Sequence, residues 1–226
     1  MIEIKNLSKN FGSHEVLKDI NIQFDNGKVY GIVGENGAGK TTLFRCISDL
    51  EDYDGKIISN PNPIKNHLGL LLTEPFFFQK ITGKEYIQLL INARNIHIDD
   101  IDARNIFDLP LNQYASTYST GMKKKLALTA ILLQANDYFI LDEPFNGVDI
   151  KSNIIITELI NKLKDMGKTV ILSSHIFSTL SDTCDEIHLL SQGSFVRSVE
   201  KSDFSSLESE MKELAIGTKI DRLGLT

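Results

Sequence analysis

The sequence predicts an α/β fold with a mostly parallel sheet, and three features carry this prediction. Strand-like apolar runs recur at 138–141, 169–173 and 186–190, and a helical pattern at about 151–166 separates the first two. Strands that alternate with helices are typical of a parallel sheet. A second group of strands alternates apolar and polar residues and indicates a small antiparallel β layer: Ile2 and Ile4, then Ile20, Ile22 and Phe24. Third, residues 82–134 follow a mostly helical pattern, which predicts a helical subdomain.

Turn and capping signals place the smaller elements. Asp25-Asn26-Gly27 predicts a hairpin turn into a strand at 28–33, and short apolar runs follow at 56–59 and 67–72. Thr82 with Glu85 forms a capping-box pattern at the start of a helix. The tail predicts one more helix, because Ser205 and Glu208 fit a second capping box and apolar residues share one face behind it: Leu207, Met211 and Leu214.

Composition describes an ordinary globular protein. The chain has 226 residues, 42% of them hydrophobic, and a formal net charge of −6, which gives no electrostatic footprint for nucleic acid. We interpret the triplet 123–125, three lysines, as a solvated helix face. Cys46 and Cys184 lie in apolar segments, as buried thiols in a reducing compartment do. No apolar run is long enough to span a bilayer and the N-terminus is strand-like, so we expect a cytosolic protein, or one that membranes hold only through a partner.

A complete GxxxxGK[ST] phosphate loop follows the strand at 28–33. The loop and its helix start contain the residues expected to bind a nucleotide: Gly34, Asn36, Gly37, Ala38, Gly39, Lys40, Thr41 and Thr42. Glycines allow backbone N–H groups to close around phosphate oxygens, Lys40 can reach the β- and γ-phosphates, and the Thr41 hydroxyl can ligate Mg²⁺. Leu43, Ile47 and Leu50 have helical spacing after the loop. Strand, loop and helix together predict the core of a P-loop NTPase, of the RecA-like kind.

A second chemical motif ends the strand at 138–141 with two acids. Asp142, at the carboxyl end of a parallel strand, is placed to hold Mg²⁺, and Glu143 is placed to polarise the attacking water. Apolar residues followed by Asp-Glu are also common strand ends in other α/β proteins. The position of this pair, about a hundred residues after the phosphate loop, favours the catalytic interpretation.

Three further segments give the chain a resemblance to the nucleotide-binding subunits of ABC transporters over nearly its whole length. Residues 118–122, Tyr-Ser-Thr-Gly-Met, stand where that family has its signature motif, and 146–149, Asn-Gly-Val-Asp, match its D-loop. Residues 173–175, Ser-Ser-His, match its switch histidine, and Phe11 stands in the place of the aromatic that stacks on adenine.

This resemblance implies roles for residues outside the phosphate loop. Phe11 and Val16 would bind the nucleotide, His175 would sense the γ-phosphate, and Ser119, Gly121 and Asp149 would complete the ATP site of a second subunit. Each has a plainer alternative when taken alone. Ser119 is also a good helix cap, a strand-end histidine is often an ordinary satisfied side chain, and Phe11 can simply fill the small β layer.

The chain departs from the family pattern at three places. Thr73 stands where the family usually has a glutamine, and because its hydroxyl is shorter we expect it to act only through water. Thr120 and Met122 replace a glycine and a glutamine of the signature, a form that resembles the drug, antibiotic and polysaccharide exporter branch. Phe145 stands where a small hydroxyl residue is common, and the sequence offers no account of it. Three aromatics at 76–78 follow Thr73 in a loop, where they can cap the core; because all three cannot point inward, at least one is expected to be exposed, and docking of a membrane partner there is the alternative to packing.

The predicted function is ATP hydrolysis that powers an ABC transporter, with Lys40, Glu143 and His175 as catalytic residues, ATP and Mg²⁺ bound, and Thr41 and Asp142 on the metal. The resemblance implies a homodimer or heterodimer of such subunits on the cytoplasmic face of a membrane, with transmembrane subunits on separate chains and no nucleic acid. We expect one domain over 1–226: a nucleotide core with the β layer at 1–73 and 135–200, a helical subdomain at 74–134 and a C-terminal extension at 201–226.

Three alternatives are open to test. One is a GTPase switch, which the sequence disfavours because the segment 161–164, Asn-Lys-Leu-Lys, lacks the aspartate of a guanine-reading motif. Another is a soluble ABC-type ATPase that acts on nucleic acid or the ribosome. The third is a weakly hydrolysing, nucleotide-binding regulatory module, which Thr73 and the loose signature motivate and the intact pair of Glu143 and His175 opposes.

Overall fold

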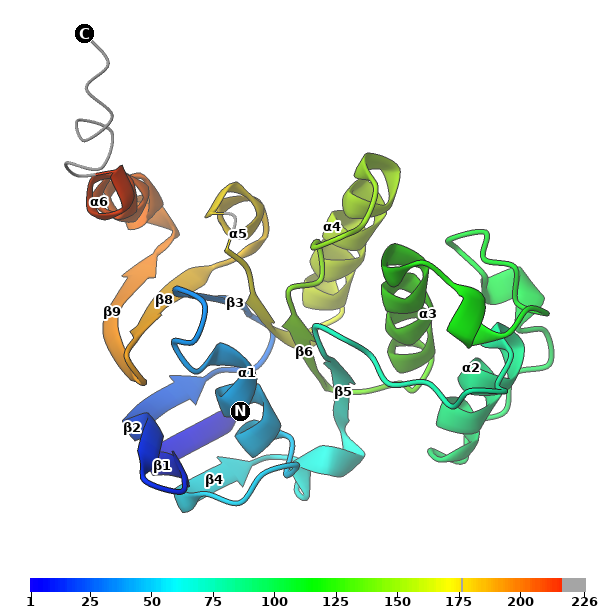
Figure 1. The fold of residues 1–226 in the computed structure, drawn as a ribbon, viewed down its shortest axis with the longest axis horizontal. Coiled ribbons are helices and arrows are strands. Elements are labelled where there is room, and N and C mark those ends of the chain that lie inside the picture. Colours follow the sequence, from blue (N-terminus) through cyan, green and yellow to red (C-terminus); the bar gives the residue numbers. More distant parts are fainter. Residues whose placement is uncertain (176, 217–226) are drawn as a thin grey trace, which may run out of the picture.

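Two β-sheets organise the chain in the computed structural model, which describes residues 1–175 and 177–216 (Figure 1). The larger sheet has the order β5-β6-β7-β3-β8-β9. Its strands are β5 (Leu68–Leu71), β6 (Tyr138–Asp142), β7 (Thr169–Ser173), β3 (Val29–Val33), β8 (Glu186–Ser191) and β9 (Ser194–Glu200). The first five are parallel and β9 is antiparallel to β8. Every residue of β3, β6 and β7 is buried, as in parallel strands covered on both faces, which confirms the predicted sheet.

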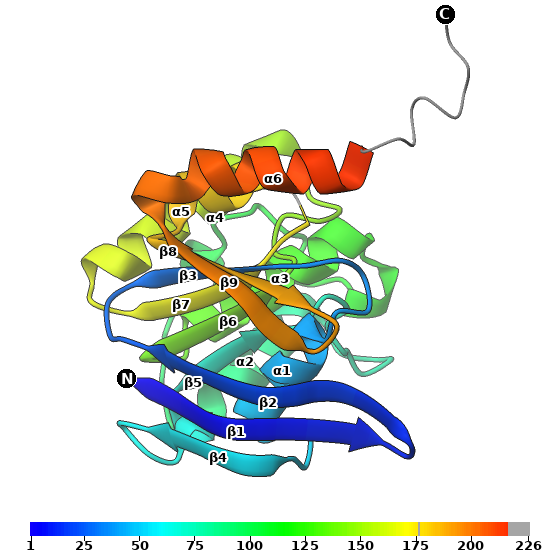
Figure 2. The same ribbon diagram turned by 90° about the vertical axis from the view of Figure 1, so that its left-hand side faces the viewer.

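The smaller sheet is antiparallel and forms the predicted β layer. Its order is β2-β1-β4, with β1 (Ile2–Phe11), β2 (His14–Phe24) and β4 (Asp54–Ser59). Ile2 and Ile4 are buried, as their alternation with polar residues predicts. Figure 2 shows this sheet lying beside the larger one, with the N-terminus between them.

The predicted hairpin at Asp25-Asn26-Gly27 is wrong. The turn exists, with Gly27 at φ 75°, but β2 and β3 belong to different sheets and do not pair. Both edges of β3 are occupied in parallel pairs with β7 and β8, which leaves no edge for β2. The turn therefore carries the chain from one sheet to the other.

Six α-helices surround the sheets in the part of the chain that the structure describes: α1 (Lys40–Ile47), α2 (Gly83–Asn92), α3 (Thr120–Leu132), α4 (Ile150–Asp165), α5 (Phe177–Thr183) and α6 (Phe204–Ile216). Short 3₁₀ turns occupy Ile64–Asn66, Asp102–Arg104, Ala115–Thr117 and Lys201–Asp203. In Figure 1, α4 and α5 cover the face of the large sheet opposite α1, and α2 and α3 lie together beyond β5. Helix α6 follows β9 at the other end of that sheet.

The helix predictions fare unevenly. The capping box of Thr82 and Glu85 is present at the start of α2. The span 82–134 is less helical than predicted, because irregular chain and short turns separate α2 from α3. Leu50 lies beyond the end of α1 and is exposed. The tail helix exists, but Ser205 lies inside α6 and not at its cap, and the side chain of Leu214 lies outside the part described.

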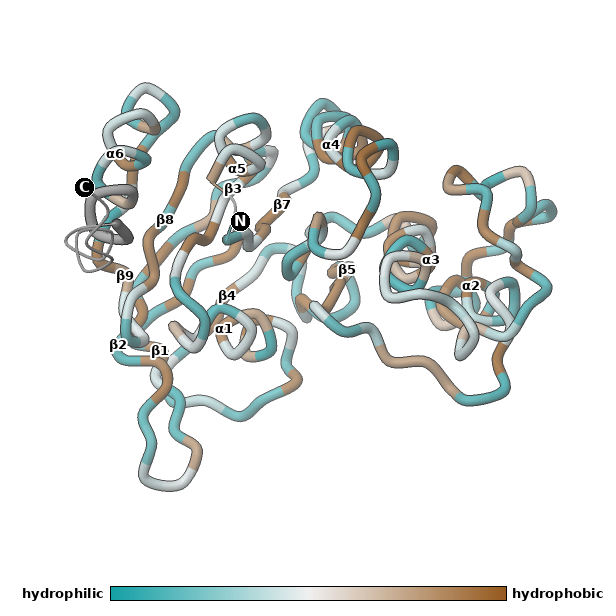
Figure 3. Tube along the Cα trace, turned by 45° about the horizontal axis from the view of Figure 1, so that its top comes forward, coloured by the Kyte–Doolittle hydropathy of each residue, from teal (hydrophilic) through white to brown (hydrophobic). Residues whose placement is uncertain are grey.

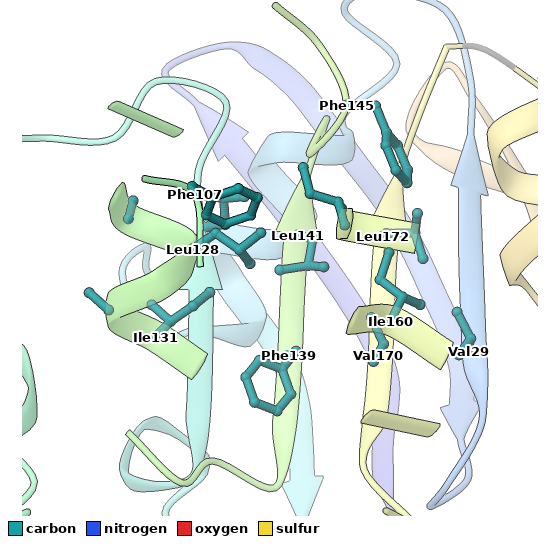
Figure 4. Packing of buried hydrophobic residues seen from close by; sticks show 14 of the residues in the cluster. Val29, Phe107, Leu128, Ile131, Phe139, Leu141, Phe145, Ile160, Val170 and Leu172 are labelled. Carbon is teal, nitrogen blue, oxygen red and sulfur yellow. The ribbon is translucent and has the colours of Figure 1, made fainter. Parts of the chain in front are cut away.

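The hydrophobic core has two parts. One fills the space between the large sheet and helices α2 to α6, and Figure 4 shows Leu141 and Leu172 of the strands facing Ile160 of α4. Phe145, for which the sequence offers no role, is buried in this part, so packing accounts for its size. The other part lies around α1, between the two sheets. Figure 3 shows hydrophobic chain concentrated along the strands of the large sheet.

Both cysteines are buried, as predicted. Desolvation raises the pKa of the Cys46 thiol to about 11 and that of the Cys184 thiol to about 12, so neither is a thiolate at neutral pH. Over residues 1–175 and 177–216, no helix combines the length and apolar character needed to cross a membrane.

Candidate active site

The phosphate loop joins β3 to α1 at the carboxyl edge of the large sheet. Two of its glycines are fixed by close neighbours. A Cβ on Gly34 would clash with the carbonyl oxygen of Leu190, and a Cβ on Gly39, whose φ is 108°, would lie 2.8 Å from the Leu17 side chain. Larger residues would therefore push the loop away from β8 and β2. The tight packing holds the loop's backbone N–H groups in the concave shape that binds phosphate.

Lys40 lies folded over this loop. Its ammonium Nζ donates to the carbonyl oxygens of Gly34, at 2.6 Å, and Glu35, at 3.1 Å, and the side chain is largely buried. These carbonyls neutralise little of the charge, because they are dipoles and not anions. A phosphate placed in the loop would therefore offer Lys40 a stronger partner than it has here.

Asp142 is buried and receives three hydroxyl hydrogen bonds. Thr41 Oγ1 and Thr73 Oγ1 each donate to its Oδ2 at 2.6 Å, and Ser173 Oγ donates to its Oδ1 at 2.6 Å. Both carboxylate oxygens of Asp142 therefore have hydroxyl partners within the chain. The direct contact of the Thr73 hydroxyl with Asp142 is one that the sequence does not predict, and action of Thr73 on the metal through water stays a prediction.

Glu143 and His175 come together at the mouth of the site. Glu143 Oε2 lies 2.8 Å from His175 Nδ1, although 32 residues separate the two in sequence. Parallel strands β6 and β7 end side by side, and each residue follows its own strand end, which explains the contact. The Glu143 side chain is mostly buried, whereas His175 is half exposed. This pair offers a carboxylate base and an imidazole side by side.

These residues line one cavity of about 620 Å³. Its lining is His14, Val16, Asn36, Gly37, Gly39, Lys40, Thr41, Thr42, Thr73, Asp142, Glu143, Asn146 and His175. The sequence predicts all of these as site residues except His14, Thr73 and Asn146. Asn146 belongs to the D-loop motif, in which only Asp149 is predicted to bind, and Thr73 stands out in the sequence only as a departure from the family pattern. No motif marks His14.

Six proposed site residues lie outside this lining: Phe11, Gly34, Ala38, Ser119, Gly121 and Asp149. Gly34 and Ala38 face a second cavity behind the loop, which β8, β9 and α6 complete. Phe11 is about half exposed, with the Lys9 ammonium 4.7 Å from its ring centre, while its neighbours in the chain His14 and Val16 reach the cavity. Stacking of Phe11 on adenine therefore stays a prediction.

The other three lie at the N-terminal end of α3 and the turn beside it. Ser119 is the N-cap of α3, where its Oγ accepts from the Met122 N–H at 3.3 Å, and it is exposed. Gly121 packs on the D-loop, since a Cβ there would lie 2.5 Å from the Gly147 carbonyl oxygen. Asp149 caps α4, and hydrogen bonds from the N–H and then the hydroxyl of Ser152 hold its pKa well below the usual range. We name this group, Ser119, Gly121 and Asp149, the α3 surface.

The lysine triplet that follows Ser119 is not a solvated face. Lys124 is only 1% exposed, whereas Lys123 and Lys125 are partly buried. The reason is that α3 packs one of its faces on the β5 end of the large sheet, and the helical turn brings Lys124 inward to the chain that follows β6.

The aromatic loop after Thr73 divides as predicted. Phe76 is 71% exposed and Phe78 is 56% exposed, and their rings form an edge-to-face pair at 5.3 Å. Phe77 instead packs against Tyr86 of α2, with ring centres 4.5 Å apart. Figure 3 shows the hydrophobic stretch in the extended segment between β5 and α2. Two adjacent exposed phenylalanines form an apolar patch that a globular protein rarely leaves uncovered.

Comparison with known proteins fits this geometry. The family model described as "ABC transporter" matches residues 17–146. The ABC transporter ATP-binding protein NatA of Bacillus subtilis is 32% identical over 232 residues, which cover 93% of this chain and 94% of NatA. The bacitracin transport ATP-binding protein BcrA of Enterococcus faecalis is 30% identical over 229 residues, 96% of this chain and 74% of BcrA. A solved dimer of the ATP-binding cassette MJ0796, bound to ADP and Pi, superposes with a TM-score of 0.79 at 20% identity, over 89% of this chain and 99% of the cassette.

Proposed function

Because this chain belongs to the ABC transporter family as an ATP-binding, ATP-hydrolysing subunit, we propose that it powers transport by ATP-driven closure of a pair of such subunits. One observation carries this proposal. The cavity gathers the phosphate loop, Asp142, Glu143 and His175 of one chain, whereas Ser119 of the α3 surface is exposed and is no part of the lining. A site split in this way needs a second chain to be complete.

Binding of ATP falls to the phosphate loop. Its backbone N–H groups and the dipole of α1 meet the phosphates, and Lys40 exchanges the carbonyls of Gly34 and Glu35 for phosphate oxygens. Val16 and His14 border the same cavity at the side of the small sheet. We propose that they and Phe11 contact the adenine end of the nucleotide, since aromatic faces stack on bases.

The donor set at Asp142 fits Mg²⁺. Thr41 and Asp142 supply a hydroxyl and a carboxylate oxygen that are already 2.6 Å apart, and hard divalent cations select oxygen ligands. Bound there with ATP, Mg²⁺ would withdraw charge from the β- and γ-phosphates. Thr73 and Ser173 keep Asp142 oriented through their own hydroxyls.

Hydrolysis falls to Glu143 and His175. Glu143 takes a proton from the attacking water as the water oxygen bonds to the γ-phosphorus, and the bond to the β-phosphate oxygen breaks to leave ADP. His175 holds Glu143 at 2.8 Å through Nδ1, which leaves Nε2 as a contact for the γ-phosphate. Lys40 offsets the negative charge of the transferred group.

The α3 surface supplies the missing half. Ser119, Gly121 and the N-terminal end of α3 present a hydroxyl, backbone N–H groups and a positive dipole, which suit the γ-phosphate bound to a second chain. The MJ0796 cassette is described as a dimer with ADP and Pi, which supports the same pairing here. Homodimer and heterodimer are both compatible with this geometry.

Mixing two inactive variants tests the shared site. Lys40→Met removes phosphate binding in one chain. Ser119→Asp keeps a good helix cap but turns a carboxylate toward the partner's phosphate. Each variant alone should lack turnover. An equal mixture should recover at most about a quarter of wild-type turnover, because half of the dimers hold one intact site of two. A mixture as inactive as its parents, at concentrations where wild type dimerises, would refute the shared site.

The membrane partner is proposed to dock at the aromatic loop. Phe76 and Phe78 present an exposed apolar pair next to Thr73, which contacts Asp142. A helix of the transmembrane subunit bound there would lie near Thr73, and Thr73 would connect it to Asp142, the proposed metal ligand.

We also propose a division of the chain into parts. Residues 1–73 and 135–200 form the nucleotide core with its β layer, 74–134 form the helical subdomain that contacts the membrane partner, and 201–226 form an extension. The chain would then sit on the cytoplasmic face of the membrane.

Export is the proposed direction. BcrA is named for bacitracin transport, and the loose signature at 118–122 resembles that of antibiotic exporters. ATP-driven accumulation of substrate inside inverted vesicles would support export, and ATP-driven loss from them would contradict it. The relatives are named as transport subunits. Their names give no support to the alternative of an ATPase that acts on nucleic acid or the ribosome.

A further inference from the structure

Lys124 lies in the first turns of α3, and its side chain is buried next to the segment that follows β6. Its Nζ donates to the carbonyl oxygens of Glu143, at 2.6 Å, and Asn146, at 2.9 Å. Burial lowers the pKa of this ammonium, while the nearby carboxylates of Glu143 and Asp142 favour its charged form. Neither partner is a side-chain anion, so a buried charge is used to hold two backbone carbonyls. Burial of an ammonium costs free energy, which its hydrogen bonds to these two carbonyls offset.

The backbone that Lys124 holds is itself strained. Glu143 has φ 51°, in the left-handed region that a residue with a side chain avoids at a cost of about 1 kcal/mol or more. Its N–H donates to Ser173 Oγ at 3.0 Å, and its carbonyl accepts from Lys124. Glu143 is thus fixed from β7 on one side and from α3 on the other. That conformation turns its carboxylate to His175.

Two more contacts join α3 to the segment 143–149. Gly121 lies so close to the Gly147 carbonyl that no side chain fits between them. Lys125 Nζ lies 3.1 Å from Asp149 Oδ2. Helix α3 and this segment therefore form one packed unit, with Lys124 at its centre and the exposed Ser119 at its end. A shift of α3 reaches Glu143 through a single hydrogen bond.

We propose that Lys124 is a positioning residue for hydrolysis, because it fixes the backbone of Glu143 by a hydrogen bond from α3. The orientation of the Glu143 carboxylate then depends on the position of α3. The hold on Glu143 follows from this chain alone. Its consequence in the dimer rests on the proposed function: Lys124 acts in the chain that supplies the cavity, and not in the chain that supplies the α3 surface.

Single variants test the hold on Glu143. Lys124→Met, which keeps most of the volume and removes the donor, should lower kcat about 10- to 100-fold with KM for ATP and the affinity for a fluorescent ATP analogue within about twofold. Lys124→Arg should restore most of kcat because it keeps a charged donor. Lys123→Met, on the same helix, is the matched control and should stay within about twofold of wild type.

Thermal melting distinguishes positioning from folding. If Lys124→Met loses kcat and ATP affinity in parallel with its Tm, or if Lys124→Arg fails to recover kcat while melting like wild type, the residue is merely structural and the proposal is overturned. An unchanged kcat in a folded Lys124→Met protein overturns it as well.

Mixed dimers then show in which chain Lys124 acts. In the Lys40→Met and Ser119→Asp mixture, the one intact site takes its cavity from the Ser119→Asp chain and its α3 surface from the Lys40→Met chain. Lys124→Met added to the Ser119→Asp chain should remove most of the remaining turnover, and added to the Lys40→Met chain it should leave turnover within about threefold. Equal losses from either chain would overturn the proposal. An inactive parent mixture refutes the shared site instead, and the single variants still decide the role of Lys124.

Discussion

The cavity and the α3 surface differ in how their residues are brought together. At the cavity, side chains from four separate stretches of sequence converge within hydrogen-bond distance: Thr41, Thr73, Asp142 with Glu143, and Ser173 with His175. On the α3 surface, Ser119 and Asp149 are exposed, Ser119 caps its own helix, and Asp149 bonds to Ser152 of its own helix and to Lys125 of α3. The cavity has partners for its charged groups within one chain. The α3 surface presents the Ser119 hydroxyl, whose recorded hydrogen bond within the described chain serves only to cap α3.

This difference teaches what one chain can do by itself. A single chain has the loop, the lysine and the carboxylates needed to hold ATP, so binding should need no second subunit. The proposed closure does need one, because Ser119 and Gly121, which are proposed to complete the phosphate shell, are no part of the chain's own cavity lining. Substitutions in the two regions should therefore separate binding, turnover and assembly.

Glu143→Gln is the strongest way to sharpen the comparison. Removing the base should lower turnover about 10²- to 10⁴-fold, while the carboxamide keeps ATP binding and the contact with His175. ATP held in an intact cavity should then keep the α3 surface of a second chain in place, so the variant should elute as a dimer with ATP and as a monomer without it. Size-exclusion chromatography and phosphate release give the two readouts. Hydrolysis at the wild-type rate, or a monomer with ATP bound, would contradict the assignment.

Thr73→Val tests whether the cavity depends on this chain's own departure from the family pattern. Valine has the shape of threonine without the hydroxyl, and Asp142 keeps its bonds from Thr41 and Ser173. We expect kcat to fall about tenfold or less, and the affinity for Mn²⁺ in the presence of ATP, read by electron paramagnetic resonance, to fall with it. Thr73→Ser, which keeps the hydroxyl, is the control. Wild-type Mn²⁺ affinity in Thr73→Val would mean that the contact with Asp142 has no function.

The smallest effect on the isolated protein is expected in the aromatic loop. Changing both Phe76 and Phe78 to Ser should leave ATPase activity unchanged and stability within about 0.5 kcal/mol, because both side chains are exposed. Membrane vesicles that contain the transporter should no longer retain this double variant. Phe77→Ser, in the same loop, is the contrasting variant and should destabilise the protein by about 2 kcal/mol or more, since its ring packs on Tyr86. Full retention of the double variant by the vesicles would move the docking site elsewhere.

The sequence predicts most of the fold because residues that are buried in strands and helices recur as apolar residues at regular spacing. Buried strands such as β3, β6 and β7 appear as apolar runs, and the motifs follow their ends. The turn at Asp25-Asn26-Gly27 misleads because turn residues report a local change of direction and not which strands pair afterwards. Leu50 shows the same limit: its spacing fits α1, but the helix ends at Ile47.

The site divides in a similar way. Lys40, Asp142, Glu143 and His175 can be predicted because each follows a strand or sits in a motif. Lys124 cannot, because its partners are the carbonyls of Glu143 and Asn146, which every residue type supplies and no motif records. A charged side chain in a charged triplet normally indicates solvent. Only the packing of α3 shows that one member of the triplet is turned inward.

The three hydroxyls around Asp142 also affect the stability of the protein after nucleotide and metal have left the site. A buried carboxylate left bare would be costly each time product departs. Here Thr41, Thr73 and Ser173 already satisfy both oxygens before any ligand arrives. Binding of Mg²⁺ there would replace a hydroxyl hydrogen bond of Asp142 by the cation, and release would restore the hydrogen bond. The ligand-free protein therefore keeps Asp142 hydrogen-bonded, and the next nucleotide can bind without a rearrangement of the buried residues around it.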